Sequence, residues 1–236
     1  MKLYLMRLAT IPPDGAPVPG YLVQTDDGIN VLVDTGVPKS HIGAYGTSPE
    51  AVFEMNEEDH VVRQLARIGV APEDVRYLVC THYDFDHAGN HEDFPAAELV
   101  VQRAHHEAAA DIPRFQATRP HWDAPGQRRR PVDGDMELLP GIELIECGGH
   151  VPGHQAVLVR LPETGPVLLA IDAIPHSALR DPDKRRLQPY DMNEVEMRVS
   201  TRKLVDLARR EGVTLIVYGH DPGQWAGLRT LPDFYD

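Results

Sequence analysis

Short apolar runs recur along the chain, separated by stretches rich in glycine, proline and acidic residues. Runs of this length, bounded by turn-forming residues, are typical of strands. The runs at residues 21–24 and 29–34 lie on either side of Asp26-Asp27-Gly28, a turn-forming sequence that favours a hairpin between these two runs. The pattern predicts strands at residues 2–6, 21–24, 29–34, 78–80, 96–102, 142–145, 156–161, 167–171 and 213–217.

Other segments have helical spacing or no clear period. Residues 57–68 place Val61, Leu65 and Ile68 on one face after a candidate cap, Asn56, so an amphipathic helix is expected there. Further helices are predicted at 104–111 and 193–210. Loops are expected at 11–20 and 41–55, and the proline-rich residues 112–135 form the least regular region of the sequence. We expect 41–55 to be an ordinary surface loop, with a lid over the site as the alternative.

Strands and interspersed helices predict a mixed α and β fold in a single domain over residues 1–236. The exposed face of the short helix at 104–111 is expected to carry His105 and His106. The basic run at 128–130 is expected to be solvated or paired with acidic neighbours. Cys80 and Cys147 each close an apolar run and are expected to be buried and unpaired.

Candidate chemistry lies where the apolar run at 78–80 ends. Side chains alternate in an extended segment, so His82, Asp84 and Asp86 would share one face and His87 the other. The loop must therefore turn after Asp84. One such loop can serve two adjacent ions, the first bound by His82 and Asp84 and the second by Asp86 and His87.

Three later strands also deliver a histidine or an aspartate at their ends. They lead to His150 within residues 148–154, to Asp172, and to His220 within residues 219–221. A single His-Asp pair is as easily a surface ion pair, but the repetition of this arrangement favours a metal site.

Five motifs together resemble the metallo-β-lactamase superfamily and, within it, the N-acyl-homoserine lactonases. They are VLVDTG (31–36), THYDFDHAGN (81–90), GGHVPGHQ (148–155), LAIDA (169–173) and YGHD (218–221). The motifs occur in the family's order at plausible spacings. The resemblance implies the family's α/β fold, a four-layer αββα sandwich.

The resemblance also implies two divalent metal ions. One would be held by His82, Asp84 and His150, the other by Asp86, His87 and His220, and Asp172 would bridge them. The family usually has a histidine where this chain has Asp84. A carboxylate is a harder, anionic donor, so we expect the metal preference to move from zinc toward iron, manganese or cobalt.

The activity implied by the resemblance is hydrolysis of a lactone, an N-acyl-homoserine lactone or a related one, by a hydroxide that bridges the two metal ions. Asp86 is the candidate catalytic residue, carrying the proton to the leaving oxygen. Phe85 occupies a position whose ring lines the pocket in the lactonases. Their substrate-binding tyrosine is replaced by Pro175, and the candidates to substitute for it are His176, Tyr83 and Tyr190.

Two further residues take their expected roles from the same resemblance. His154 matches a histidine of the lactonases that is not a ligand, so a structural role is expected. Asp34 would lie near the metals, or would simply form a turn, and both readings stay open.

Composition narrows the choice of partner. The formal charge of −13, from 23 basic and 36 acidic residues, argues against nucleic acid or an anionic membrane. No apolar run could span a bilayer or act as a secretory signal, which predicts a cytoplasmic protein. The expected partner is a small lactone or ester, and pairing into a homodimer stays open. Alternative functions are a phosphodiesterase, a diiron redox protein prompted by Asp84, and a metal-binding protein without catalysis.

Overall fold

The computed structural model describes residues 1–48 and 51–236, and within them the strands form two sheets. The first has six strands in the order β1-β2-β3-β4-β5-β6, and the second has five in the order β11-β10-β9-β8-β7. The strands are β1 (Lys2–Ile11), β2 (Ala16–Gln24), β3 (Asn30–Val33), β4 (Val75–Val79), β5 (Glu98–Gln102), β6 (Arg129–Val132), β7 (Met136–Leu139), β8 (Ile142–Glu146), β9 (Gln155–Leu161), β10 (Gly165–Ile171) and β11 (Leu215–Tyr218).

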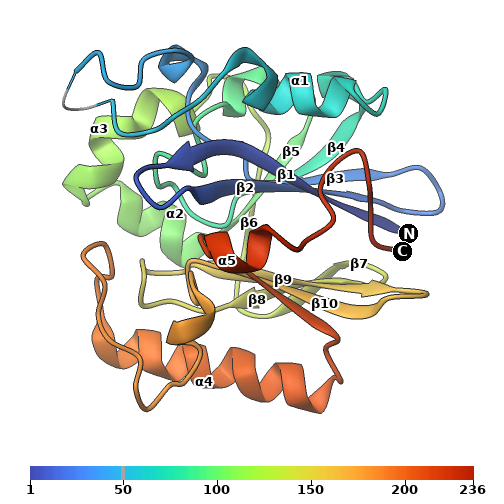
Figure 1. Ribbon diagram of the computed structural model, residues 1–236, viewed down its shortest axis with the longest axis vertical. Coiled ribbons are helices and arrows are strands. Elements are labelled where there is room, and N and C mark those ends of the chain that lie inside the picture. The colour runs from blue at the N-terminus through green and yellow to red at the C-terminus, as the bar shows by residue number, and fades with distance from the viewer. Residues whose placement is uncertain (49–50) are drawn as a thin grey trace.

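Helices cover the outer faces of both sheets. The helices are α1 (Val61–Ala66), α2 (Arg103–Ala109), α3 (Pro113–Trp122), α4 (Glu194–Arg210) and the short α5 (Pro222–Trp225). Figure 1 shows α1 above the paired sheets and α4 below them. The arrangement is the four-layer αββα sandwich that the family resemblance implied.

Alternation along the strands explains the layers. In β1, Leu3 and Leu5 belong to the apolar core between the two sheets, whereas Tyr4 and Met6 belong to the core between the first sheet and its helices. A third core lies between the second sheet and α4, which contributes Leu204. Strands buried on both faces read as continuous apolar runs, so the runs in the sequence were a reliable signal.

The strand β2 begins earlier than predicted, because Pro17 and Pro19 belong to it and not to a loop. This part of β2 pairs with β1, whereas pairing with β3 begins only at Tyr21. A proline has no N–H to donate and is tolerated where a strand has one neighbour. The loop predicted at 11–20 was therefore wrong for residue 11, which ends β1, and for residues 16–20.

Residues 112–135, the least regular region of the sequence, contain α3 and β6. The helical pattern is weak because α3 buries mainly Phe115 and Trp122, seven residues apart, and has Pro120 in its interior. The indole N–H of Trp122 donates to the carbonyl of Phe115 at 2.9 Å. Within the basic run, Arg129 pairs with Asp123, as expected.

The predicted helix at 57–68 is shorter in the structure. A 3-10 turn at Glu57–Asp59 precedes α1, and extended backbone at His60 separates the two. The expected cap, Asn56, therefore serves the 3-10 turn. The lid interpretation of residues 41–55 depends partly on residues 49–50, which lie outside the described residues.

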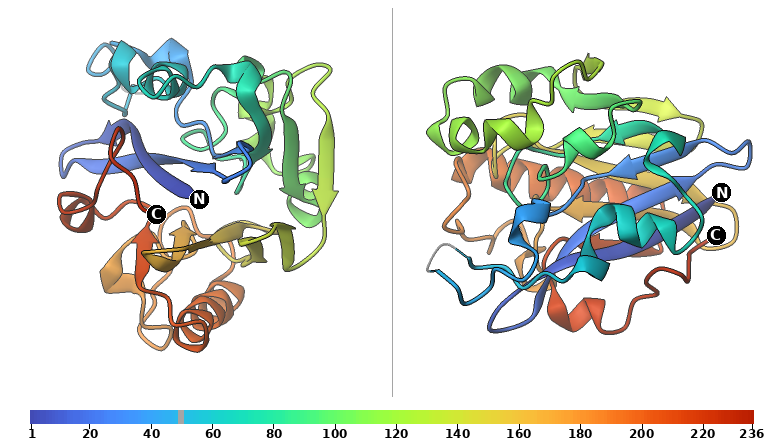
Figure 2. Two further views of the ribbon diagram at one scale, coloured as in Figure 1. Left: turned by 90° about the vertical axis from the view of Figure 1, so that its right-hand side faces the viewer. Right: turned by 90° about the horizontal axis from the view of Figure 1, so that it is seen from above.

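The chain ends lie side by side at one end of the sandwich, as both views in Figure 2 show. Leu3 and Tyr235 exchange two backbone hydrogen bonds, of 2.8 and 2.9 Å. The C-terminal segment thus covers the free edge of β1, which would otherwise present unpaired backbone groups. No helix in the described part of the chain is both long enough and apolar enough for a membrane crossing.

Candidate metal centre

The loops that follow β4, β8, β10 and β11 bring the predicted ligands together. Three groups of histidine and aspartate side chains have their donor atoms within 4.8 Å of one another. They are His82, Asp84 and His150; Asp86, His87 and His220; and His82, His87 and Asp172. All seven predicted ligands are included, so the structure brings together every residue of that set.

The first group is centred on Asp84. Its Oδ2 atom lies 3.2 Å from Nε2 of His82 and 3.0 Å from Nε2 of His150. The second group is looser, with Oδ2 of Asp86 at 3.7 Å from Nε2 of His87 and 3.8 Å from Nε2 of His220. Each group offers one carboxylate and two imidazoles, a donor set suited to a divalent transition metal.

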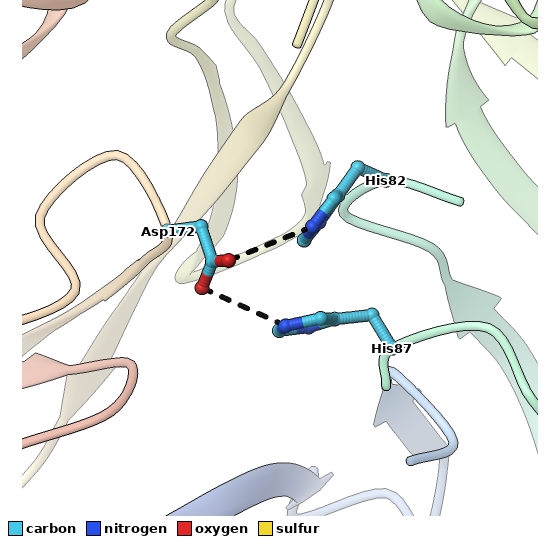
Figure 3. Close-up of side chains that lie close together, drawn as sticks. All are labelled: His82, His87 and Asp172. Atoms are coloured by element: carbon cyan, nitrogen blue, oxygen red, sulfur yellow. Dashed lines mark ion pairs between the residues drawn. The ribbon is translucent and has the colours of Figure 1, made fainter. Parts of the chain in front are cut away.

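Asp172 lies between the two groups, and its two oxygens face different ways. Oδ1 is 3.0 Å from Nε2 of His220 and 3.6 Å from Nε2 of His87. Oδ2 is 3.3 Å from Nε2 of His150 and 3.7 Å from Nε2 of His82. Figure 3 shows the carboxylate reaching from one oxygen to His82 and from the other to His87. This is the placement that a bridging ligand requires.

Each of the four histidines uses Nδ1 outside the centre and turns Nε2 toward it. The Nδ1 partners are Thr81 Oγ1 for His82, Asp34 Oδ2 for His87, Asp191 Oδ1 for His150 and the carbonyl of Pro17 for His220, at 2.8 to 3.0 Å. A proton held on Nδ1 leaves a lone pair on Nε2, the form that binds metal.

Several buried atoms at the centre lack a hydrogen-bond partner among the described residues. They are Nε2 of His82, Nε2 of His87 and Oδ1 of Asp172. Buried polar atoms are rarely left without a partner, because the desolvation cost is then uncompensated. Since these are donor atoms of the predicted ligands, the residues fit a pair of bound metal ions.

Asp34 has a larger role than a turn. Its buried carboxylate accepts hydrogen bonds from the N–H and the hydroxyl of Thr81, at 2.8 and 2.7 Å, and pairs with Nδ1 of His87. Asp34 (φ 60°) and Ile171 (φ 49°) are the non-glycine positions with positive φ in the described chain. Strained backbone of this kind is typical of functional sites, and here it adjoins Thr81 and Asp172.

The carboxylates of the centre dominate its electrostatics. Burial by itself lowers the pKa of His87, but Asp86, Asp172 and Asp34 outweigh it and raise the pKa to about 10. Burial and the neighbouring His87 lower the pKa of His82 to about 3, so that ring is neutral at pH 7. The cluster therefore attracts positive charge, whether as protons or as metal ions.

Sequence reasoning missed three residues that support the ligands. Arg114 on α3 places Nε 2.8 Å from Oδ1 of Asp84. Asp191 holds His150, and the fully buried Arg185 lies with Nη2 3.4 Å from Oδ2 of Asp191. None of the three stands in a recognisable motif, so the sequence offered no signal for them.

The expectation that His105 is solvated was wrong. Its ring is buried, and its Nε2 accepts a hydrogen bond of 2.8 Å from the N–H of Tyr83. Its Nδ1 donates to the carbonyl of Pro152, also at 2.8 Å. The side chain thus ties the loop carrying His82 to the loop carrying His150, because both loops pack against α2.

His154 lies outside the ligand groups, with Nδ1 3.3 Å from Sγ of Cys147. This position agrees with the structural role expected for it. Cys80 and Cys147 are both buried and unpaired, as predicted.

Phe85 lies among other rings beside the centre. Its ring centroid is 4.7 Å from that of His41, 5.9 Å from that of Phe53 and 5.7 Å from that of His121. His176 is partly exposed and has Nε2 3.4 Å from Oδ1 of Asp221, outside the ligand groups. The structure thus places Phe85 and His176 without testing their predicted contacts with a substrate.

The other two candidates for the missing phenol differ in exposure. Tyr83 is buried, stacked on Trp122 at 4.1 Å, with its hydroxyl 2.9 Å from Nδ1 of His106. Tyr190 is 70% exposed. A buried phenol with a partner is not available to a substrate, so Tyr83 is a poor replacement.

Known proteins agree with this geometry. The model of the metallo-beta-lactamase superfamily matches residues 13–220. An N-acyl homoserine lactonase from a Bacillus species is 33% identical over 224 residues, which cover 92% of this chain and 86% of that protein. The N-acyl homoserine lactonase AttM of Azorhizobium caulinodans is 33% identical over 236 residues, covering 93% and 88%.

A solved structure resembles this one over nearly its whole length. It is an N-acyl homoserine lactone hydrolase with the product N-hexanoyl-L-homoserine bound at its catalytic metal center, and it matches with a TM-score of 0.88 at 28% identity. The match covers 99% of this chain and 98% of that one. The four-layer fold, the five motifs and the family match lead to one conclusion: this chain belongs to the metallo-beta-lactamase superfamily.

Proposed function

We propose that this protein is a metal-dependent lactonase that opens N-acyl-homoserine lactones and thereby quenches quorum signals. In this proposal, the seven ligand residues named above hold two divalent ions. The observation that carries it is the position of Asp172, whose Oδ1 faces His220 and whose Oδ2 faces His150, at 3.0 and 3.3 Å. The lactonase relatives add support.

The chemistry supplied by two such ions when bound is activation of water near neutral pH and polarisation of a carbonyl. The protein itself orients the donors, because each imidazole is fixed through Nδ1. The three carboxylate side chains differ in their exposed fraction, which is 17% for Asp86, 12% for Asp84 and 10% for Asp172. Asp86 is thus the most open to a substrate, and we assign it the transfer of a proton to the leaving oxygen.

The rings around Phe85 support an acyl-bearing substrate. Phe85 packs with Phe53 and His41 to form an apolar wall beside the centre. Such a wall favours a substrate with a hydrocarbon chain over a small polar ester, because burial of that chain stabilises binding. His176 is kept as the proposed contact to the polar part of the lactone.

The proposal can be tested with the purified full chain. Ring opening of N-hexanoyl-homoserine lactone would be followed in a pH-stat beside γ- and δ-lactones and bis-p-nitrophenyl phosphate. We expect lactone turnover that is lost with a chelator and restored by divalent metal, and Asp172→Asn should lower it at least about 100-fold. Phosphodiester turnover without lactone turnover would favour the phosphodiesterase alternative. Iron content with oxygen consumption would favour the redox alternative.

Several expectations stay predictions. They concern the lack of nucleic-acid and membrane partners, a cytoplasmic location, a single domain over residues 1–236, and pairing into a homodimer. Which of zinc, iron, manganese or cobalt is bound also depends on Asp84 and its surroundings.

A further inference from the structure

Asp84 has a positively charged neighbour, Arg114, which belongs to none of the five sequence motifs. Arg114 projects from α3, and its Nε atom lies 2.8 Å from Oδ1 of Asp84. The same guanidinium donates from Nη1 to the backbone carbonyl of Tyr190 at 3.0 Å. The Arg114 side chain is only 27% exposed, so the ion pair is largely shielded from water.

The two oxygens of Asp84 consequently have different partners. Oδ2 faces His82 and His150, at 3.2 and 3.0 Å, whereas Oδ1 is next to Arg114. One oxygen is thus directed at the ligand group, and the other is engaged by a cation. The family's usual histidine also presents one donor atom and no net charge. Asp84 and Arg114 together reproduce both properties.

We propose that Arg114 restricts Asp84 to a single, charge-compensated oxygen donor and thereby holds this ion site to a zinc-like metal preference. Arg114 is a positioning residue in this proposal, because it acts through Asp84. The inference rests on the proposed function in one respect, namely that His82, Asp84 and His150 hold a metal ion.

The expected consequence follows from carboxylate chemistry. Zinc favours few ligands with nitrogen among them, whereas manganese favours sites with more oxygen donors. A carboxylate freed from Arg114 carries a full negative charge and can offer both oxygens. Removing Arg114 should therefore raise the affinity for manganese relative to zinc. The group of Asp86, His87 and His220 does not include Asp84, so only one of the two proposed ion sites should respond to the loss of Arg114.

The test is a metal competition that needs no activity assay. Metal-stripped full-length protein is dialysed against fixed zinc and excess manganese, and both metals are then measured per chain by mass spectrometry. We expect Arg114→Met to raise the manganese-to-zinc ratio at least about tenfold, the lower end of what losing a partner of a metal ligand costs in affinity.

The matched control is Arg119→Met on the same helix. Arg119 pairs with Asp123 at 2.8 Å and is exposed, so its loss should leave the metal ratio unchanged. A second comparison uses Asp84→His with and without Arg114→Met. Because Arg114 is proposed to act through Asp84, removing Arg114 in the histidine background should not change the ratio.

Three outcomes would overturn the inference. They are an unchanged ratio in folded Arg114→Met, an equal rise in Arg119→Met, and an equal rise in the Asp84→His background. If the methionine variant does not fold, Arg114→Gln removes the same charge and is measured in its place. A parent chain that binds no metal would overturn the proposed function as well, whereas a parent with two ions and an insensitive ratio would overturn only the role of Arg114.

Discussion

Nδ1 of His87 lies 2.8 Å from a carboxylate oxygen of Asp34, a residue that the chain holds at a φ of 60°. The same oxygen accepts the hydroxyl of Thr81, which in turn contacts Nδ1 of His82 at 2.9 Å. One buried carboxylate therefore orients a histidine in each of the two ligand groups, directly for His87 and through Thr81 for His82.

We expect Asp34→Asn to weaken metal binding about 10- to 100-fold, because the amide cannot accept all of these hydrogen bonds. Asparagine tolerates positive φ, so the backbone should keep its conformation. Metal affinity measured against a competing chelator checks this. Asp27→Asn, in the exposed hairpin turn, is the control and should bind metal normally. Unchanged affinity in Asp34→Asn would contradict the role given to this carboxylate.

Gly219 lies so close to Asp172, the proposed bridging residue, that a side chain at position 219 would displace Asp172. A Cβ atom there would lie 2.9 Å from Oδ1 of Asp172 and 2.8 Å from the carbonyl of Ile171. We expect Gly219→Ala to move Asp172 and to reduce bound metal and lactonase activity at least about tenfold. Metal content and kcat/KM are the measurements.

Gly227→Ala is the matched control, since its Cβ would meet only the carbonyl of Gln224, at an ordinary 3.7 Å. It should retain metal and activity. Full metal content in Gly219→Ala would show that Asp172 can adjust without losing its position.

The proposed ligands stood out in the sequence because each follows an apolar strand at a short distance, and the family resemblance then assigned them to two ions. Residues 81–90 begin two positions after the last residue of β4, and Asp172 is the first residue after β10. Because these strands are buried on both faces, each reads as a continuous apolar run whose end is easy to locate in the sequence. The residues that follow then reach the rim of the sheets, where a site can form.

The supporting residues could not be predicted in the same way. Arg114 reaches Asp84 across 30 positions of sequence, from a helix whose buried face contains mainly Phe115 and Trp122. Asp191 reaches His150 across 41 positions, from a loop without periodicity. Such contacts depend on how the layers pack, and local pattern carries no information about them.

The sequence also left Tyr83 as a candidate substrate contact, and only its burial in the folded structure argues against that role. We expect Tyr83→Phe to lower the free energy of unfolding by about 1 kcal/mol, because the hydrogen bond to His106 is lost, and to leave kcat within about twofold. Denaturant unfolding and lactone turnover check this. Tyr190→Phe, at an exposed position, should not change stability. A tenfold fall in kcat for Tyr83→Phe would return Tyr83 to the catalytic site.

The stability of the metal-free chain should depend on pH in a defined way. Burial alone would lower the pKa of His150, but Asp191, Asp84 and Asp172 raise it to about 9, and the pKa of His87 is about 10 against an ordinary 6.5. A raised pKa means that the folded state holds the proton more tightly than the unfolded state. His150 and His87 therefore make their full contribution to the free energy of unfolding below about pH 6.5, and this contribution is lost as the pH rises through 9 to 10.

Asp84 contributes to the acidic side of the same curve. Burial tends to raise its pKa, but the hydrogen bond with His150 and the nearby His82 lower it well below the ordinary 3.8. Its contribution is present above about pH 4 and is lost as the pH falls further. Burial also lowers the pKa of His82 to about 3 and those of His91 and His105 to about 4, so protonation of these side chains favours the unfolded chain below about pH 6.5. The metal-free chain should therefore be most stable near pH 6.5.

Bound metal should reverse the alkaline part of this curve, because a ligand histidine must give up its proton to bind. We expect the Tm of chelator-treated protein to fall from pH 6.5 to 10, while the gap between it and the Tm with excess metal widens. Thermal unfolding across this range, with and without metal, measures both curves. A metal-free Tm that rises between pH 7 and 9 would contradict the electrostatic account, because it would mean that folding releases protons from these histidines instead of retaining them.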